Sequence, residues 1–447
     1  MEQHLELDAD IDRWRGYVQR HQAISSADID ELEDHLRGQV ADLRATGLDD
    51  TEAFGVAIKR LGNLDAVSRE FAREHSDRLW KQLALVPASQ GSGATGSREL
   101  VVVLALAVGA GLAVRAGLAW LDDAAFARNL GLLVVPFVAA YFAWKRRLRP
   151  RTVAALVLPA VVLAVLLNVY PFAADSSTEP LAAMHAVVAL WLLVGIAYVG
   201  GRWRSDGKRM DFARFTGELA IYFTLLAIGG GVLTGLTVAV LRLLGIDAEP
   251  ALGSWVLPFA VPGALVVAAW LVEAKQNVVE NIAPVLTRVF TPLTILMLLT
   301  LLGALATSGG LGEVGRELLI LMDAILVLVV GLLLYSISAR DPLAPPGLFD
   351  TLQLVLLLTA LAVDAVLLTA MLTRIAEFGA SPNKLAALGL NLLLLVHLTW
   401  SARLSVGFLR GHAAFAPLER WQTRYLTVYG VWAAAVVVVF PPAFAFT

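Results

Sequence analysis

The chain contains no cysteine among its 447 residues, and charged residues make up only 16% of it. The missing cysteines exclude disulfide bonds, thiolate metal sites, a cysteine nucleophile and lipid attachment through sulfur. The sequence also lacks a Walker-type glycine loop, a His-Glu-x-x-His pair and a Gly-x-Ser-x-Gly motif, which argues against an ATP-driven pump, a metalloprotease and a serine hydrolase. No pattern predicts a catalytic residue, a metal site or a cofactor, so we expect a protein that is not an enzyme.

Hydrophobic residues make up 58% of the chain and form a nearly unbroken series of apolar stretches from about residue 99 onwards. A stretch of 18 or more apolar residues is long enough to cross the roughly 30 Å hydrocarbon core of a bilayer as a helix. The sequence therefore predicts an all-α, polytopic membrane helical bundle, preceded by a small cytosolic helical bundle. We count eleven predicted spans, at about 99–121, 124–144, 152–173, 181–201, 216–244, 251–272, 289–307, 318–337, 350–373, 384–406 and 424–445.

The loops between the spans differ in charge and so predict an orientation. Two alternate loops are basic and contain Lys145, Arg146, Arg147, Arg149 and Arg151 in one case, and Arg202, Arg204, Lys208, Arg209 and Arg214 in the other. The loops at 174–180 and 245–250 contain acidic residues and neither lysine nor arginine. Because cytoplasmic loops carry the excess of positive charge, we expect a bacterial inner-membrane protein with its N-terminus in the cytoplasm and its C-terminus outside.

Residues 1–85 form a predicted prefix domain with 18 acidic and 11 basic residues. This acidic balance argues against binding of nucleic acid, which needs a basic face. Four short helices are predicted, and the second, from about residue 25 to Gly47, has one apolar face at Ile29, Leu32, Leu36, Val40 and Leu43. No apolar signal segment precedes them. Residues 86–98, rich in glycine and serine, predict a flexible linker to the membrane domain at 99–447.

Several short motifs of the prefix occur in a recognisable order: Ile29-Asp30-Glu31-Leu32-Glu33-Asp34-His35-Leu36, Gly47-Leu48, Glu52-Ala53 and Arg60-Leu61-Gly62-Asn63. On these motifs the segment resembles the permease-prefix domain of bacterial membrane proteins, which is similar to the HAAS-type helical signalling module. The resemblance implies a cytosolic sensory or interaction element with a protein partner. His35 lies one turn from Glu31, but further metal ligands are missing, so we interpret it as a hydrogen-bonding or interhelix contact.

Asp364 lies near the middle of the ninth predicted span, where an ionisable group normally faces the bundle interior and is a functional candidate. Gln353 lies on nearly the same helix face, and Asn391 and His397 of the tenth span bracket the depth of Asp364. We predict that these four residues form a polar cluster at the midplane. Two interpretations stay open: a proton or cation site, or a structural hydrogen-bond network that holds two helices together.

Two further features of the spans predict contacts inside the membrane. Arg115 and Asp323 lie at similar depth near the outer ends of their spans and form a candidate ion pair, although Arg242 is a rival partner and Arg115 also reaches the outer surface. The fifth and sixth spans carry residues that weaken helices at corresponding depth and form a candidate hinge, as in the broken helices of transporters: Gly229, Gly230, Gly231, Pro258 and Pro262. Kinks and close packing without a site are the alternative.

The last third of the chain also resembles a family, on motifs that include Tyr335-Ser336-Ile337-Ser338, Arg340-Asp341, Phe349-Asp350, Glu377-Phe378-Gly379 and Ser381-Pro382-Asn383-Lys384. It is similar to a broad, uncharacterised bacterial multi-pass family, which implies no site residue.

Two functions remain open at this point. The first is a sensory or regulatory membrane protein whose prefix recruits a cytosolic protein partner. The alternative is a secondary transporter or channel that uses the polar cluster around Asp364. Both place the chain in a lipid bilayer, and no pattern predicts its oligomeric state.

Overall fold

The computed structural model describes residues 93–274, 282–307, 316–342 and 344–447, together with 36–40, 43–44 and the single residues Glu33, Asp49, Ala53 and Ala57. The chain divides into two compact units, Met1–Thr95 and Gly96–Thr447, which are called unit 1 and unit 2 below. The predicted helices at 8–21 and 63–79, Glu31, His35 and residues 86–92 lie outside the described residues.

The described part of unit 1 agrees with the predicted apolar face of the second prefix helix. Leu36, Val40 and Leu43 are helical and almost completely buried, with exposed fractions of 0%, 2% and 6%. Ala53 and Ala57, in the third predicted helix, are also helical and fully buried. Helix α6 begins at Gly93, inside the stretch 86–98 that was predicted as a linker, and the division into prefix, linker and membrane domain stays a prediction.

Unit 2 is built from helices, and no strand occurs among the residues that the structure describes. Their bounds are α6 Gly93–Trp120, α7 Asp123–Lys145, α8 Pro150–Val169, α9 Thr178–Tyr198, α10 Asp206–Leu243, α11 Glu249–Ala251, η1 Leu252–Val256, α12 Leu257–Ala274, α14 Ile282–Thr307, α15 Arg316–Ser338, α16 Leu348–Phe378, α17 Pro382–Leu409 and α18 Ala416–Ala443. Within the described ranges, 11 helices are long and apolar enough to cross a membrane, α11, η1 and α12 counting as one. The predicted all-α polytopic bundle is therefore confirmed.

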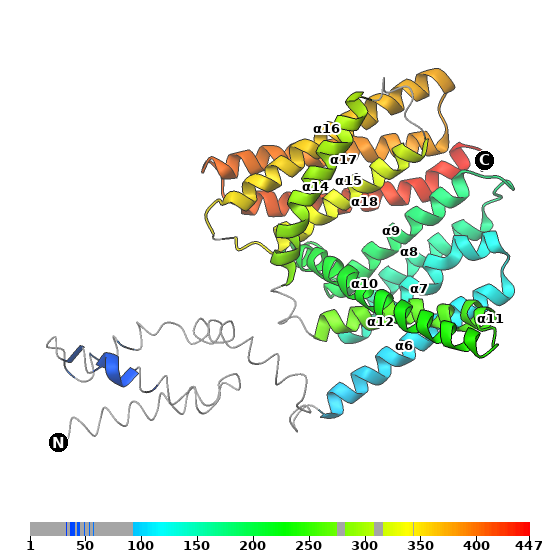
Figure 1. Cartoon of the computed structure of the whole chain (residues 1–447), viewed down its shortest axis with the longest axis horizontal. Coiled ribbons are helices and arrows are strands. Elements are labelled where there is room, and N and C mark those ends of the chain that lie inside the picture. The colour runs from blue at the N-terminus through cyan, green and yellow to red at the C-terminus, as the bar shows by residue number, and fades with distance from the viewer. Residues whose placement is uncertain are drawn as a thin grey trace. The chain divides into compact units, whose positions relative to one another are not determined.

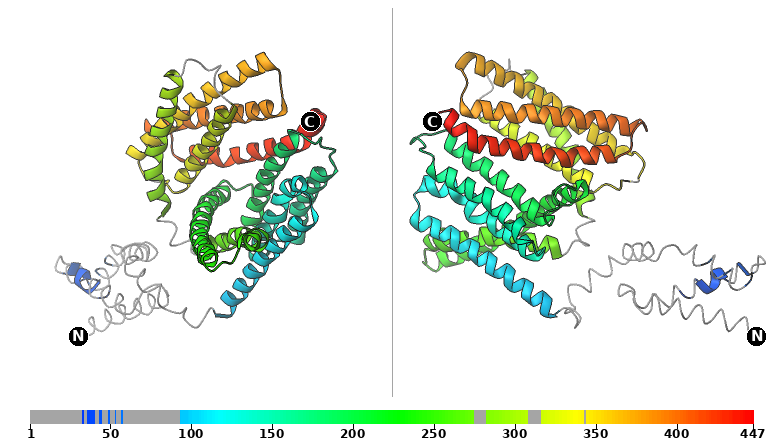
Figure 2. Two further views of the ribbon diagram at one scale, coloured as in Figure 1. Left: turned by 45° about the vertical axis from the view of Figure 1, so that its right-hand side comes forward. Right: turned by 180° about the vertical axis from the view of Figure 1, so that it is seen from behind.

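The helices of unit 2 pack in two groups, which Figure 1 shows one above the other. The first group contains α6–α9 and α12 around a core that includes Tyr141, Phe142 and Leu167. The second contains α14–α17 around a core that includes Met322 and Leu357. The first half of α10, with α18, contributes to both cores, and Figure 2 shows α18 running beside α9.

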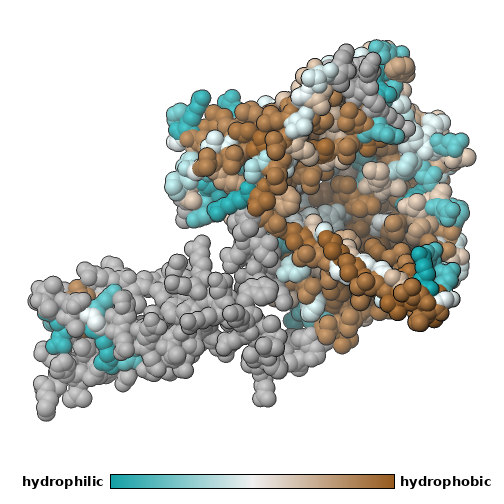
Figure 3. Space-filling view, in the orientation of Figure 1, coloured by the Kyte–Doolittle hydropathy of each residue, from teal (hydrophilic) through white to brown (hydrophobic). Residues whose placement is uncertain are grey.

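The surface of unit 2 is apolar in a way that a water-soluble protein does not tolerate. Hydrophobic residues cover most of the face in Figure 3, and hydrophilic residues gather toward its two sides. Large side chains with at least half of their surface exposed include Leu104, Val161, Leu236, Leu299, Leu328 and Val439. This distribution fits a lipid bilayer as the environment of the helices.

The two ends of the helices are identified by specific contacts. Thr178, at the start of α9, donates its backbone N–H to the carbonyl of Thr447 over 3.1 Å, so the C-terminus lies beside the acidic loop at 174–180. The other end of α9, at Tyr198, lies beside Arg146 and Arg202 of the two basic loops. A 21-residue helix is about 30 Å long, so the C-terminus and the basic loops lie at opposite ends of the bundle.

Substitution of two glycines by alanine tests the packing of α17 against α18. A Cβ atom at Gly389 would overlap the indole ring of Trp432, whereas no atom lies within 4 Å of a Cβ atom at Gly230 in α10. We expect Gly389→Ala to lower the free energy of unfolding by about 1–3 kcal/mol, and Gly230→Ala to leave it unchanged or slightly higher. Unfolding of the purified protein by denaturant measures both, and equal stability of the two variants would contradict this packing.

Candidate functional site

Asp364 lies near the centre of α16 and is fully buried, with an exposed fraction of 0%. The helix turns it inward because Leu357, Ala360, Val363 and Leu367, which share its buried face, pack against α14, α15 and α17. Among the residues that the structure describes, neither oxygen of the Asp364 carboxyl group has a hydrogen-bond partner. An unpartnered carboxyl group inside a membrane bundle is costly, so this residue needs an explanation beyond packing.

A second carboxyl group, which is hydrogen-bonded to an amide, interacts electrostatically with Asp364. Asp323 of α15 is close enough to Asp364 for the two groups to interact electrostatically. Asn391 of α17 donates one N–H to Asp323 Oδ1 over 2.8 Å and the other to the carbonyl of Ala387 over 2.9 Å. Both N–H groups of the amide are therefore used, and its Oδ1 has no partner. Asp364, Asp323 and Asn391 are called the acidic site below.

His397 lies two turns further along α17 and belongs to a hydrogen-bond network with α18. Its Nδ1 lies 2.8 Å from the hydroxyl of Tyr429, and its Nε2 lies 2.8 Å from Oε1 of Gln422. Gln422 donates its own N–H to Ser401 over 2.7 Å. Because Oε1 of Gln422 only accepts, Nε2 of His397 carries a proton, and Nδ1 of the neutral ring accepts from Tyr429. His397, Gln422 and Ser401 are fully buried.

Tyr429 is the member of the network that also interacts with the acidic site. Its ring lies beside His397, and Asp364 is among the groups that interact with it electrostatically, although no hydrogen bond joins Tyr429 to Asp364 among the described residues. His397, Ser401 and Ser405 are buried and follow at four-residue spacing on one face of α17. Polar groups therefore continue from His397 toward the end of the bundle that carries the basic loops.

The structure divides the predicted four-residue cluster. Asn391 bonds to Asp323 of α15, whereas His397 bonds to Tyr429 and Gln422 of α18. Gln353 instead donates to the hydroxyl of Ser336 at the end of α15. The prediction is wrong for Gln353 because eleven residues along a helix amount to about 16 Å, so the two residues share a face and differ in depth.

The predicted ion pair between Arg115 and Asp323 is not formed. Arg115 lies on α6, with its guanidinium group over the ring of Trp255 at 5.1 Å, whereas Asp323 accepts from Asn391 in the other helix group. The rival partner Arg242 bonds to Glu249 at the same end of its own span. Arg115 and Asp323 were predicted to lie at one level of the membrane. The depth of a residue does not show which helices are its neighbours.

The candidate hinge is also absent from the fifth span. α10 continues through Gly229, Gly230 and Gly231 without a break, and all three are exposed on the bundle surface. In the sixth span a π-helical turn, Leu252–Val256, precedes Pro258, and both Pro258 and Pro262 are buried in α12. Pro258 lacks a backbone N–H, and the irregular turn that precedes it accommodates the missing helix hydrogen bond. The turn lies near the N-terminal end of the span Glu249–Ala274.

Sequence reasoning missed the contributions of Asp323 to the acidic site and of α18 to the histidine network. Gln422 and Tyr429 lie seven residues apart, so they share one face of α18. That spacing was the available signal, because polar residues at helical spacing inside an apolar span face other helices. Within the described ranges, no three histidine, aspartate or glutamate side chains gather as a metal site.

The fold places the chain in the class of polytopic, all-α membrane proteins. Its second helix group contains the buried acidic site. Comparison of the chain with known protein families, with curated proteins and with solved structures gave no match.

Proposed function

We propose that unit 2 is an ion-coupled secondary transporter and that Asp364 binds the coupling proton. The observation that carries this proposal is the fully buried, unpartnered carboxyl group of Asp364 in a membrane-spanning helix. A structural hydrogen-bond network would give that group a donor, as Asp323 has in Asn391. A buried carboxyl group without a donor or a contacting cation is tolerated when it carries a proton or binds a cation.

The neighbouring polar groups support a route for the proton. Tyr429, His397, Gln422 and Ser401 form a hydrogen-bonded series between α17 and α18, and Tyr429 also interacts electrostatically with Asp364. His397 and Ser401 are four residues apart on α17, which corresponds to about 6 Å. The hydroxyl of Tyr429 and the imidazole of His397 are groups that exchange protons, and we propose them as the members of the route nearest to Asp364.

A monovalent metal ion such as Na⁺ is the second candidate for the coupling ion. Three oxygen atoms of the acidic site lack a partner, namely both carboxyl oxygens of Asp364 and Oδ1 of Asn391. Oxygen atoms without donors are the ligands that hard cations prefer. The proton is favoured because it neutralises Asp364 without requiring further ligands.

Flux into proteoliposomes tests the proposal. The purified chain is reconstituted, a pH gradient or a Na⁺ gradient is imposed, and the internal concentration of each ion is followed with a fluorescent dye. We expect proton movement above that of protein-free liposomes when a cotransported solute is supplied. Movement of Na⁺ alone would assign the site to that ion, and absence of both fluxes for every solute offered would contradict the transporter proposal.

We also propose that the chain lies in the bacterial inner membrane with its basic loops in the cytoplasm. The positive-inside rule supports this orientation, and the C-terminus lies beside the acidic loop at the other end of α9. We expect alkaline phosphatase fused after Thr447 to be active, because that enzyme folds only outside the cytoplasm. A green fluorescent protein fused at the same place should stay dark, and the reverse pattern would overturn the orientation.

The prefix, residues 1–85, is proposed as a cytosolic regulatory element that recruits a protein partner. Its acidic balance and its resemblance to the permease-prefix domain support this role. The division of the chain into two compact units allows the prefix to be removed without cutting a helix of unit 2. A chain that starts at residue 86 is expected to keep basal ion flux and to lose its response to cytosolic extract.

A further inference from the structure

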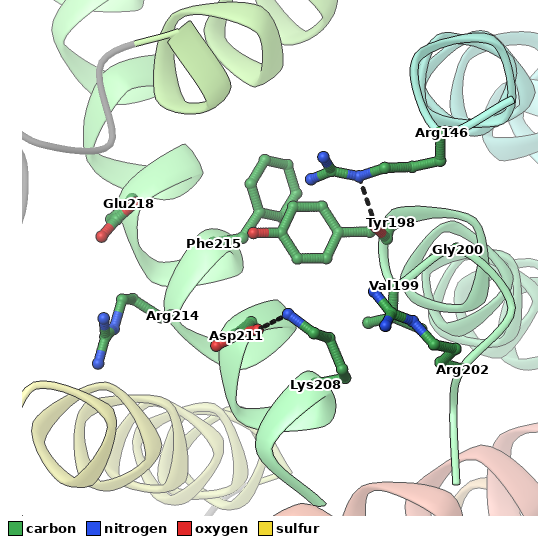
Figure 4. A pocket seen from close by; sticks show the side chains of 10 residues that line it. All are labelled: Arg146, Tyr198, Val199, Gly200, Arg202, Lys208, Asp211, Arg214, Phe215 and Glu218. Atoms are coloured by element: carbon green, nitrogen blue, oxygen red, sulfur yellow. Dashed lines mark hydrogen bonds and ion pairs between the residues drawn. The ribbon is translucent and has the colours of Figure 1, made fainter. Parts of the chain in front are cut away.

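A polar pocket opens at the end of unit 2 that carries the basic loops. It has a volume of about 450 Å³ and lies between the C-terminal ends of α7 and α9 and the first turns of α10 (Figure 4). Arg146 comes from the end of α7, Arg202 from the loop after α9, and Lys208 and Arg214 from α10. Two helices and the loop after α9 thus bring four cationic side chains to one opening.

The charge of the pocket is unbalanced toward the positive side. Its two acidic residues are Asp211 and Glu218. Lys208 is paired with Asp211 at 2.8 Å, and Arg146 is paired with Glu273 at the end of α12, also at 2.8 Å. Arg214 donates to the backbone carbonyl of Ser338. A carbonyl carries no formal charge, so this bond does not neutralise Arg214.

Arg202 is the cation that is most available to a ligand. No hydrogen bond or ion pair of its guanidinium group occurs in the part of the chain that the structure describes, and its side chain is exposed. Arg146, Arg202 and Lys208 line the same pocket as Tyr198 and are drawn on different sides of its ring in Figure 4. A planar guanidinium group of this kind matches the oxygen atoms of a phosphate in pairs.

The inner wall of the pocket is aromatic. Tyr198 and Phe215 stack with their ring centres 4.6 Å apart, and Phe215 is buried in the first core. A cationic opening above an apolar wall, at the level where the helices leave the membrane, is suited to a group that is anionic at one end and apolar at the other. Basic pockets between transmembrane helices on the cytoplasmic side bind anionic lipid headgroups in this manner.

We propose that this basic pocket binds a phosphate group, with an anionic phospholipid headgroup or free phosphate as its source, and that Arg202 is the principal ligand. The proposal rests on the pocket alone and holds whether or not unit 2 transports an ion. Binding of an anion here would tie the ends of α7, α9 and α10 together and stabilise the first helix group.

The test compares two arginines of one loop in the full-length chain. Arg202 lines the pocket, whereas Arg204, two residues away and also exposed, does not, so Arg204→Gln is the matched control for Arg202→Gln. Each variant in detergent is titrated with short-chain phosphatidylglycerol, with phosphatidylcholine of the same chain length, and with inorganic phosphate. Native mass spectrometry gives the dissociation constant of each probe.

We expect saturable binding of phosphatidylglycerol, weakened about tenfold by Arg202→Gln and less than about twofold by Arg204→Gln, since a charged hydrogen bond is lost only in the first variant. Binding of inorganic phosphate with the same dependence on Arg202 would support the phosphate site and assign it to the free anion. Equal effects of the two substitutions, equal binding of phosphatidylcholine, or no binding of either anionic probe would overturn the proposal.

Discussion

Replacement of Asp364 by asparagine is expected to reduce gradient-driven proton flux to that of protein-free liposomes. The amide has the same shape as the carboxyl group, but it cannot gain or lose a proton in the physiological range. Because Asp364 is fully buried and both of its oxygens lack a partner, the substitution breaks no hydrogen bond that holds the fold. Flux and folding are therefore expected to separate in this variant.

The matched control is Asp175→Asn, since Asp175 is an exposed acidic residue of the loop between α8 and α9. We expect this control to keep the flux of the unsubstituted chain. Elution as one symmetrical peak in gel filtration and an unchanged thermal midpoint would show that both variants are folded. A folded Asp364→Asn variant with full flux would remove Asp364 from the transport step.

Replacement of His397 by alanine is expected to lower the free energy of unfolding by about 3 kcal/mol. The substitution leaves a cavity beside the ring of Tyr425, whose centre lies 4.5 Å from that of His397. It also leaves Tyr429 and Gln422 without their hydrogen bonds to the imidazole. Cavity formation and a buried acceptor without a donor each cost about 1–3 kcal/mol or more. Gln422 is fully buried, so water does not replace the lost bond.

The control for this prediction is His412→Ala in the exposed loop between α17 and α18. Its effect is expected to stay within about 0.5 kcal/mol, as for surface substitutions in general. Unfolding of both variants by increasing detergent or denaturant, followed by circular dichroism, gives the difference. Similar stability of His397→Ala and His412→Ala would mean that the network between α17 and α18 does not hold the helices together.

The number of spans was predictable because it depends on local properties, namely the length and apolar character of each stretch. The ends of the helices were less predictable. The fifth span was expected to start at residue 216, but α10 begins at Asp206, where the hydroxyl of Ser205 accepts from the N–H of Lys208. Those additional turns are polar and lie outside the apolar window, so hydropathy alone does not include them.

The candidate site was predictable in part. A single charge at the centre of an apolar span identified Asp364, and Asn391 was placed near it in depth. The partners were not predictable, because depth in the membrane does not define which helices touch. Arg115 and Asp323 share a level but lie on helices of different groups, whereas Tyr429 and Gln422 meet His397 from a helix that follows in sequence.

The glycines of the fifth span show a further limit of sequence reasoning. Gly229, Gly230 and Gly231 predict a hinge by their intrinsic freedom, yet helix hydrogen bonds continue through them in α10. Inside a bilayer the backbone has no competing water, so a broken helix would leave polar groups unpaired. The resemblances of residues 10–80 and 334–398 to known families stay predictions, and the partner of the prefix is a proposal.

The central claim is that Asp364 carries and exchanges a proton inside the bundle. Infrared difference spectroscopy of the reconstituted chain tests it most directly, because a protonated carboxyl group absorbs at a higher frequency than a carboxylate and shifts when the solvent is changed to D₂O. We expect a band of a buried protonated carboxyl group that changes with imposed pH and is missing in Asp364→Asn. Identical spectra of the two chains at every pH would contradict it.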